Sequence, residues 1–168
     1  MSKDLELEPQ INAFKQAMRR LTSTVSIVTT ADQEKRHGMI ATAVCSIGVS
    51  PPSVLVSVAM NASIHGPLIA RGKYCVNLLA VNHQHLVLPF SGVLKGEERF
   101  SVGDWERGPA NLPYLRDAQA SLFCTVASVI PFAHHSIVLG CVDDIATSEE
   151  VNPLLYENGR LAIARALA

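Results

Sequence analysis

The sequence predicts a mainly β protein, folded as a closed or split β-barrel with a few flanking helices. Runs rich in β-branched and apolar residues recur along the chain, separated by hairpin turns, whereas few segments have a helical period. No GxGxxG motif follows a predicted strand and no P-loop is present, so a Rossmann-type fold is not expected. The 168 residues contain no internal repeat or linker, which predicts one domain over residues 1–168.

The composition excludes several classes of function. A formal charge of −1 gives no electrostatic basis for binding nucleic acid or an anionic membrane. No apolar run approaches the roughly 18 residues that a membrane-spanning helix needs, and the acidic, polar N-terminus does not resemble a signal peptide. The cysteines occur singly in strand-like runs, which is typical of small buried residues in a reduced, cytoplasmic protein; they are Cys45, Cys75, Cys124 and Cys141.

The first third of the chain predicts a helix followed by a strand. Pro9 suits the first turn of a helix over residues 9–21, whose apolar positions recur at helical spacing. These positions are Ile11, Phe14, Met18 and Leu21. Residues 24–30 are rich in β-branched side chains and predict a strand, which a charged hairpin loop over residues 31–36 follows.

Residues 38–58 form the stretch around which the chain is organised. They predict two strands joined by the turn Ser50-Pro51-Pro52, because proline cannot pair inside a central strand. Small side chains in the first strand would let a flat ligand lie against the backbone; they belong to the run Ala41, Thr42, Ala43, Val44, Cys45 and Ser46. A buried hairpin with a tight loop explains the same pattern without a ligand.

Two polar positions have both a structural and a functional interpretation. Asn61 or Ser63 could cap a short helix that extends through residue 69, or could bind a phosphate. Asn77 lies in the middle of an apolar strand over residues 73–80, where its amide either is satisfied in the core or faces a ligand.

The second half predicts a helix, a long irregular region and the remaining strands. A helix over residues 82–90, capped by Asn82, precedes an irregular region at 91–118 that is rich in glycine and proline. Strands are expected at 119–130, 136–147, 153–156 and 159–166. His83 and His85 are two residues apart and would not share a helical face, and the six histidines lack ligand spacing, so no metal site is predicted.

The organising stretch resembles the flavin-binding signature of the short-chain flavin reductase family. The family's usual form is Gly-Met-Thr-Ala-Asn-Ser-Phe-x-Ser, then Pro-Pro and a valine-rich strand; here the residues are GMIATAVCS and SPPSVLVSV. The variant Ala-Thr-Ala-Val-Cys-Ser is most similar to the reductase component of two-component 4-hydroxyphenylacetate 3-monooxygenases. Other stretches agree in order over nearly the whole chain: Phe14 to Thr30, Cys75 to Leu79, Phe90-Ser91-Gly92, Glu97 to Ser101, Trp105 and His135 to Gly140.

The resemblance implies an FMN-binding split β-barrel of Greek-key type that forms a homodimer, with flavin near the subunit interface. An apolar content of 48% agrees with a self-associating surface. The resemblance further implies that the backbone of residues 41–46 contacts the flavin ring and that Asn61 and Ser63 hold its phosphate. It also assigns Asn77 and Phe90 to the cofactor site. His135 corresponds to a histidine beside the nicotinamide, whereas His134 replaces a common Asp.

A flavin reductase transfers a hydride from C4 of NADH or NADPH to N5 of FMN or FAD. The resemblance implies that the reduced flavin is supplied to a partner monooxygenase. The cofactors carry this chemistry, so no nucleophile motif is needed, and the sequence contains none. Two alternatives remain: a reductase of the same fold that serves another acceptor, such as a corrinoid cobalt, and a non-catalytic flavin-binding protein. Thr42-Ala43 in place of the commoner Asn-Ser leaves the choice between FMN and FAD open.

Overall fold

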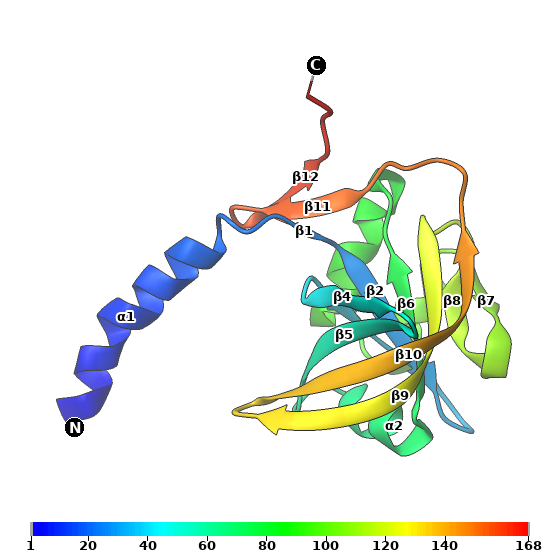
Figure 1. The fold of residues 1–168 in the computed structure, drawn as a ribbon, viewed down its shortest axis with the longest axis horizontal. Helices are drawn as coiled ribbons and strands as arrows, with labels where there is room; N and C mark the ends of the chain where they lie inside the picture. The colour runs from blue at the N-terminus through cyan, green and yellow to red at the C-terminus, as the bar shows by residue number, and fades with distance from the viewer. Residues whose placement is uncertain (1, 168) are drawn as a thin grey trace.

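The computed structural model describes residues 2–167, with side chains from residue 8 onward. Its centre is a seven-stranded antiparallel sheet in the order β3-β2-β6-β9-β10-β5-β4. The strands are β2 (Ser26–Ala31), β3 (Arg36–Ala41), β4 (Val44–Val49), β5 (Pro52–Ala59), β6 (Lys73–Leu78), β9 (Ala120–Phe132) and β10 (His135–Thr147). The sheet curls strongly, but β3 and β4 remain unpaired edges, so the barrel is split rather than closed (Figure 1). The predicted mainly β class is therefore confirmed, and its closed alternative is wrong.

Two smaller sheets lie beside the central one. A three-stranded sheet joins β1 (Ser23–Thr24) to the hairpin of β11 (Leu154–Glu157) and β12 (Arg160–Ile163). A short pair, β7 (Trp105–Arg107) and β8 (Pro113–Leu115), lies within the region predicted as irregular. That region also contains 3₁₀ turns at Gly96–Ser101 and Pro109–Asn111, so short local structure replaces the expected long loop.

One core fills the concave side of the central sheet and lies against α2 (His65–Arg71). Alternate residues of β5 point into it, because successive side chains of a strand face opposite sides. Val56 and Leu68 are fully buried there, together with Tyr74 and Val138. The alternation that the sequence shows in this strand is therefore the signature of one buried face.

A second core is aromatic and supports β3 from the other side. The rings of Phe90, Phe100 and Trp105 pack with centroids 5.0–5.3 Å apart. Gly38 faces this cluster, and a Cβ atom added there would lie 2.6 Å from Phe90 Cε1. The glycine that opens the organising stretch is thus required by the aromatic side chains behind it.

The helices depart from the predicted boundaries. The first helix, α1, spans Ser2–Met18, so Pro9 lies inside the helix instead of in its first turn. The helix expected over residues 82–90 is a 3₁₀ helix at Val81–Leu86 followed by a π-type turn at Pro89–Val93. Ala80, rather than Asn82, occupies the N-cap position of the 3₁₀ helix.

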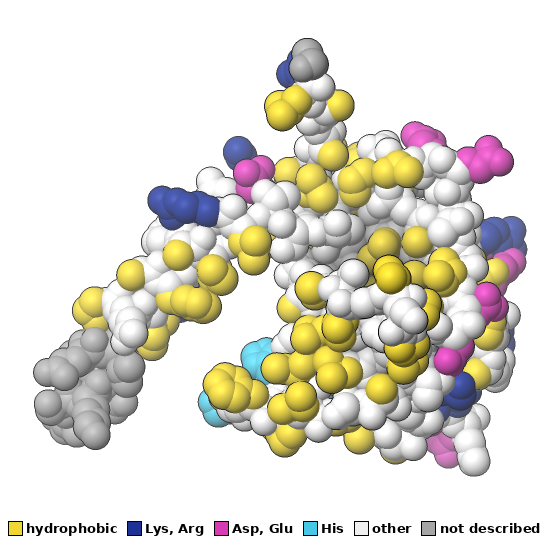
Figure 2. Space-filling view, in the orientation of Figure 1, with side chains coloured by type: hydrophobic (Ala, Val, Ile, Leu, Met, Phe, Trp, Pro, Cys, Tyr) yellow, Lys and Arg dark blue, Asp and Glu magenta, His cyan; other side chains and the backbone are white. Residues whose placement is uncertain are grey.

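Two apolar surfaces face outward. The helix α1 extends away from the sheets, and its predicted apolar stripe is exposed: Ile11, Phe14 and Met18, continued by Leu21, are 44–63% exposed (Figure 1). The edge strand β4 is also exposed, including Ile47 and Val49. Figure 2 shows apolar side chains along α1 and over the face that carries the β4 and β9–β10 hairpins. No helix in the described part of the chain is both long and apolar enough to cross a bilayer.

Candidate functional site

The segment between β3 and β4 presents backbone groups on an accessible surface. Ala41 is buried at the end of β3, whereas Thr42 and Ala43 are exposed. The carbonyl of Ala43 accepts a hydrogen bond from the Ser57 N–H at 3.1 Å, which ties the segment to β5. No described residue accepts a hydrogen bond from the backbone N–H of Thr42 or Ala43. These two donors are therefore available to the polar edge of a planar ligand.

The remaining residues of the predicted ring-contact segment lie in β4. Val44 is half-buried, whereas Cys45 and Ser46 are exposed. The expectation that every cysteine is buried is therefore wrong for Cys45, because β4 is an edge strand, and it is met only in part for Cys141, which is half-buried. Cys75 and Cys124 are buried as expected, and desolvation raises the pKa of the Cys124 thiol to about 12. That thiol remains protonated at neutral pH and cannot act as a nucleophile.

Asn61 and Ser63 lie in the turn between β5 and α2, and neither caps the helix. The N-cap residue of α2 is Ile64, which makes no side-chain capping bond. Both side chains are exposed. Helix capping, the structural alternative for these residues, is therefore excluded.

Arg99 completes the surroundings of Ser63. One guanidinium nitrogen of Arg99 lies 3.3 Å from Ser63 Oγ and donates at 2.6 Å to the carbonyl of Gly38. Its Nε donates to the carbonyl of Leu94 at 2.8 Å. Among the described residues, no carboxylate forms an ion pair with Arg99. The guanidinium is thus fixed by carbonyls while its charge is uncompensated, which suits an anionic ligand.

Sequence reasoning did not single out Arg99 as a site residue. It appears in the quoted stretch Glu97 to Ser101, but one arginine in a glycine-rich region is ordinarily a solvated side chain. The 3₁₀ turn at Gly96–Ser101 brings it across to β3. Only the tertiary contact with Gly38 reveals its position.

Two hollows connect Arg99 to the β3–β4 segment. The first has a volume of about 260 Å³ and includes Ser63 and Arg99, with Ile40, Phe90 and Ser91 in its wall. The second, of about 320 Å³, shares Ile40 and Ser91 with the first. Its other lining residues are Val25, Ala41, Thr42, Val87, Tyr156 and Leu161. The surface therefore runs from a cation and a hydroxyl to a mainly apolar wall with free backbone donors.

Phe90 supports this surface from below. Its side chain is 2% exposed and packs against Phe100 and Trp105, so it contributes to the wall of the first hollow as part of the aromatic core.

Asn77 does not belong to this surface. It is fully buried, and its Nδ2 donates to the carbonyl of Ile27 at 3.0 Å and to Thr29 Oγ1 at 3.3 Å. Its Oδ1 accepts from the Leu115 N–H at 2.8 Å and from Ser121 Oγ at 3.0 Å. Every polar group of the amide is used within the core, so the structure supports the core-amide alternative and removes Asn77 from the candidate site.

His135 begins β10 at the tip of the β9–β10 hairpin. It is exposed and pairs in register with Ala59 of β5. The adjacent carbonyl of His134 accepts a hydrogen bond from the Met60 N–H at 2.9 Å. This hydrogen bond holds the hairpin tip next to the turn that carries Asn61 and Ser63. His135 itself lines neither the 260 Å³ nor the 320 Å³ hollow.

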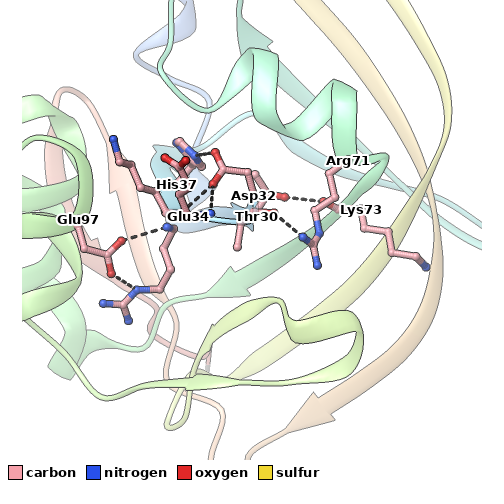
Figure 3. A network of polar contacts seen from close by, with 10 residues as sticks. Thr30, Asp32, Glu34, His37, Arg71, Lys73 and Glu97 are labelled. Carbon is pink, nitrogen blue, oxygen red and sulfur yellow. Dashed lines mark hydrogen bonds and ion pairs between the residues drawn. The ribbon is translucent and has the colours of Figure 1, made fainter.

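A polar network on the β2–β3 hairpin extends to Glu97, two residues before Arg99 (Figure 3). Arg36 Nε lies 2.5 Å from Glu97 Oε1, and this pair joins β3 to the turn that contains Arg99. Asp32 accepts hydrogen bonds from His37 and from the Lys35 and Glu34 N–H groups, which lower the pKa of its carboxyl to about 2. No cluster of metal-ligating side chains occurs among the described residues.

Residues 18–165 match a protein family described as "Flavin reductase like domain". The chain is 37% identical over 154 residues to the reductase component of an FADH2-dependent resorcinol hydroxylase from Rhizobium sp. strain MTP-10005, covering 90% of this chain and 86% of the relative. It is 35% identical over 153 residues to the 4-hydroxyphenylacetate 3-monooxygenase reductase component of Pseudomonas aeruginosa, covering 90% of each.

A third relative and a solved structure are also flavin reductases. The NADH-dependent FMN reductase RutF of Cronobacter sakazakii is 38% identical over 148 residues, covering 88% of this chain and 89% of the relative. The solved structure of the flavin reductase PheA2 superimposes with a TM-score of 0.83 at 29% identity, covering 92% of this chain and 98% of that one.

Proposed function

The chain belongs to the flavin reductase-like domain family, and we propose on this basis that it is an NAD(P)H-dependent flavin reductase that acts on FMN or FAD. The observation that carries this proposal beyond family membership is Arg99, whose charge has no acidic partner among the described residues. Arg99 lines the first of two hollows that share Ile40 and Ser91, and Thr42, whose backbone N–H is free, lines the second.

The residues of this surface fit a flavin mononucleotide unit. Arg99 and Ser63 would hold the phosphate through charge-assisted hydrogen bonds. Asn61 lies in the same turn as Ser63 but lines neither hollow, so its part in phosphate binding rests on the family resemblance. Small apolar side chains and the free N–H groups of residues 42–43 would contact the ring, and residues 44–46 of β4 would extend this contact along the strand. A bound flavin supplies the hydride acceptor, N5. The protein's part is to bind the two nucleotides, orient them and place donors where negative charge develops.

His135 would orient the nicotinamide nucleotide. Its backbone is fixed by pairing with β5, while its imidazole is exposed beside the Asn61–Ser63 turn. An imidazole at this position can hydrogen-bond an amide or a phosphate without altering the sheet. We therefore assign it a role in binding NAD(P)H rather than flavin.

The reduced flavin would be consumed by a partner monooxygenase. Two relatives are reductase components of such systems, one for resorcinol and one for 4-hydroxyphenylacetate. Because the two relatives serve oxygenases with different substrates, the comparisons support the class of partner and not its substrate. Delivery to a different acceptor remains the second candidate.

We also propose that two copies of the chain associate. The edge strand β4 is exposed on both faces, and the stripe on α1 is unpartnered within the described residues of one chain. An apolar edge strand is a template for pairing with another chain. Changing Val49 to Lys should therefore yield a smaller particle in light scattering at micromolar concentration; a wild-type monomer would contradict the dimer.

The direct test is steady-state oxidation of NADH and NADPH by the flavin-stripped protein, crossed with FMN, FAD and riboflavin. Oxidation should require added flavin and should produce reduced flavin anaerobically. Turnover that is independent of flavin would refute the proposal, and flavin binding without any turnover would identify a flavin store. Adding a candidate oxygenase then separates a monooxygenase system from other acceptors.

A further inference from the structure

Tyr156 lies where two hollows meet at the ring end of the surface. It lines the 320 Å³ hollow together with Ala41 and Thr42, and it also lines a larger hollow of about 480 Å³ on the side of α1. Thr42 is common to both. Tyr156 therefore shares both hollows with Thr42, whose backbone N–H is free.

The backbone of Tyr156 is held on both sides. It lies in β11, where it pairs with Ser23 of β1 and with Leu161 of β12. The next residues of the hairpin are anchored as well, since the Asn158 N–H donates to the carbonyl of Arg19 at 2.9 Å. The position of the side chain is thus determined by two strand pairings rather than by a mobile loop.

The side chain of Tyr156 is accessible to a ligand. It is 43% exposed, and no described residue makes a side-chain hydrogen bond with its hydroxyl or an aromatic contact with its ring. By contrast, Tyr114 uses its hydroxyl to donate to Glu106 and packs on Phe123. The backbone of Tyr156 is therefore fixed by two strand pairings, whereas its side chain has an exposed ring face and a hydroxyl without a hydrogen-bond partner among the described residues.

We propose that Tyr156 is a ring-binding residue of the flavin site, in the wall of the hollow that Ala41 and Thr42 also line. This inference rests on the proposed function. A phenol ring offers a flat apolar face with a polar tip, which suits a planar heteroaromatic ligand that is apolar across its faces and polar at its edge. The hairpin of β11 and β12 thereby becomes part of the active site instead of a peripheral appendage.

The role of Tyr156 can be separated from that of the phosphate site. Flavin affinity should be measured by fluorescence titration with both FMN and riboflavin, which share the ring but differ in the phosphate. Tyr156→Ala should weaken binding of both by the same factor, about three- to tenfold for loss of an aromatic contact. Arg99→Gln should weaken FMN binding far more than riboflavin binding.

Conservative and neighbouring variants control for folding. Tyr156→Phe should retain wild-type affinity because the ring face is preserved, and Tyr156→Leu should behave like Tyr156→Ala despite its bulk. Glu157→Ala is on the same strand but lines neither the 320 Å³ nor the 480 Å³ hollow, so it should leave both affinities unchanged. Quenching of bound-flavin fluorescence should also diminish in the Leu and Ala variants, since a phenol in contact with the ring quenches by electron transfer.

The outcomes distinguish the two proposals. If wild-type protein binds neither flavin, the proposed function fails. If wild-type protein binds both and the melting temperature of Tyr156→Ala is unchanged while its two affinities are also unchanged, Tyr156 is not a ring-binding residue. A loss for FMN alone would place Tyr156 at the phosphate end and would equally overturn the assignment.

Discussion

Gly38 and Phe90 are in such close contact that a single methyl group would not fit between them. A Cβ on Gly38 would lie 2.6 Å from Phe90 Cε1 and 3.3 Å from the ring of Phe100. The same glycine accepts a hydrogen bond from Arg99 through its carbonyl at 2.6 Å. One residue therefore links the aromatic core to the cation of the candidate phosphate site.

Gly38→Ala should lower the free energy of unfolding by about 1–3 kcal/mol, because overpacking forces the aromatic rings or β3 to move. FMN affinity should fall as well, since Arg99 loses its fixed position. Gly66→Ala is the matched control: nothing lies within 4 Å of the added methyl, and the site is in α2. Chemical denaturation and FMN titration of both variants measure the effects, and equal stability of the two would contradict this packing account.

Arg99→Gln should weaken FMN binding by at least about tenfold, which corresponds to loss of one hydrogen bond to a charged group. Ser63→Ala should cause a smaller loss in the same direction. Arg107→Gln, in β7 and outside both the 260 Å³ and the 320 Å³ hollow, should have no effect. If riboflavin binding falls as much as FMN binding, Arg99 acts on the fold of the site rather than on the phosphate.

His135→Ala should slow reduction of bound flavin or raise the KM for NAD(P)H, with flavin affinity unchanged. Hydride transfer demands close alignment, and a small misplacement can cost on the order of 100-fold in rate. Stopped-flow reduction of the flavin-saturated variant measures this directly. His134→Ala, its neighbour in the exposed turn, is the natural comparison. Wild-type reduction at every nucleotide concentration would remove His135 from the site.

Asn77→Ala should lower stability by about 3 kcal/mol or more, because several buried partners of the amide lose their hydrogen bonds together. Flavin affinity of the folded protein should be unaffected. Denaturant titration, combined with flavin binding in the absence of denaturant, checks both parts. A selective loss of flavin binding with unchanged stability would show that Asn77 is a flavin-binding residue after all.

The lowered pKa of Asp32 makes the free energy of unfolding depend on pH. Its native pKa of about 2 lies below the ordinary value of 3.8, so its ionised form favours the folded state. That contribution is complete above the ordinary pKa and is lost as the pH falls from about 4 to about 2. Asp32→Asn should therefore melt at a lower temperature than the wild type at pH 7, and the difference should shrink over that interval. A difference that is constant with pH would exclude the carboxylate as its cause.

Local patterns predicted β5 because one of its faces is buried, and β2 because both of its faces are buried. The alternation in β5 and the β-branched residues of β2 correspond to observed strands and to a core. The same reasoning misplaced Pro9, because a helix that extends into solvent is not restricted to starting at its apolar stripe. Asn77 shows that a polar residue in an apolar strand does not reveal whether its partners are ligands or core atoms.

The candidate site was only partly predictable. Residues 41–46 and Ser63 are contiguous with recognisable motifs, so sequence reasoning reached them. Arg99 and Tyr156 come to the site from distant segments, through a 3₁₀ turn and a C-terminal hairpin. Their roles depend on contacts that no local period encodes.

The free-standing helix α1 has a consequence for how the protein behaves on dilution. An isolated helix of its length is only marginally stable in water, and Pro9 removes one of its backbone donors. Its helicity must then depend on what covers Ile11 and Phe14. The helicity of α1 should consequently depend on protein concentration. On dilution, the helical signal in far-ultraviolet circular dichroism and the resistance of α1 to proteolysis should decline together, while the β-sheet signal persists.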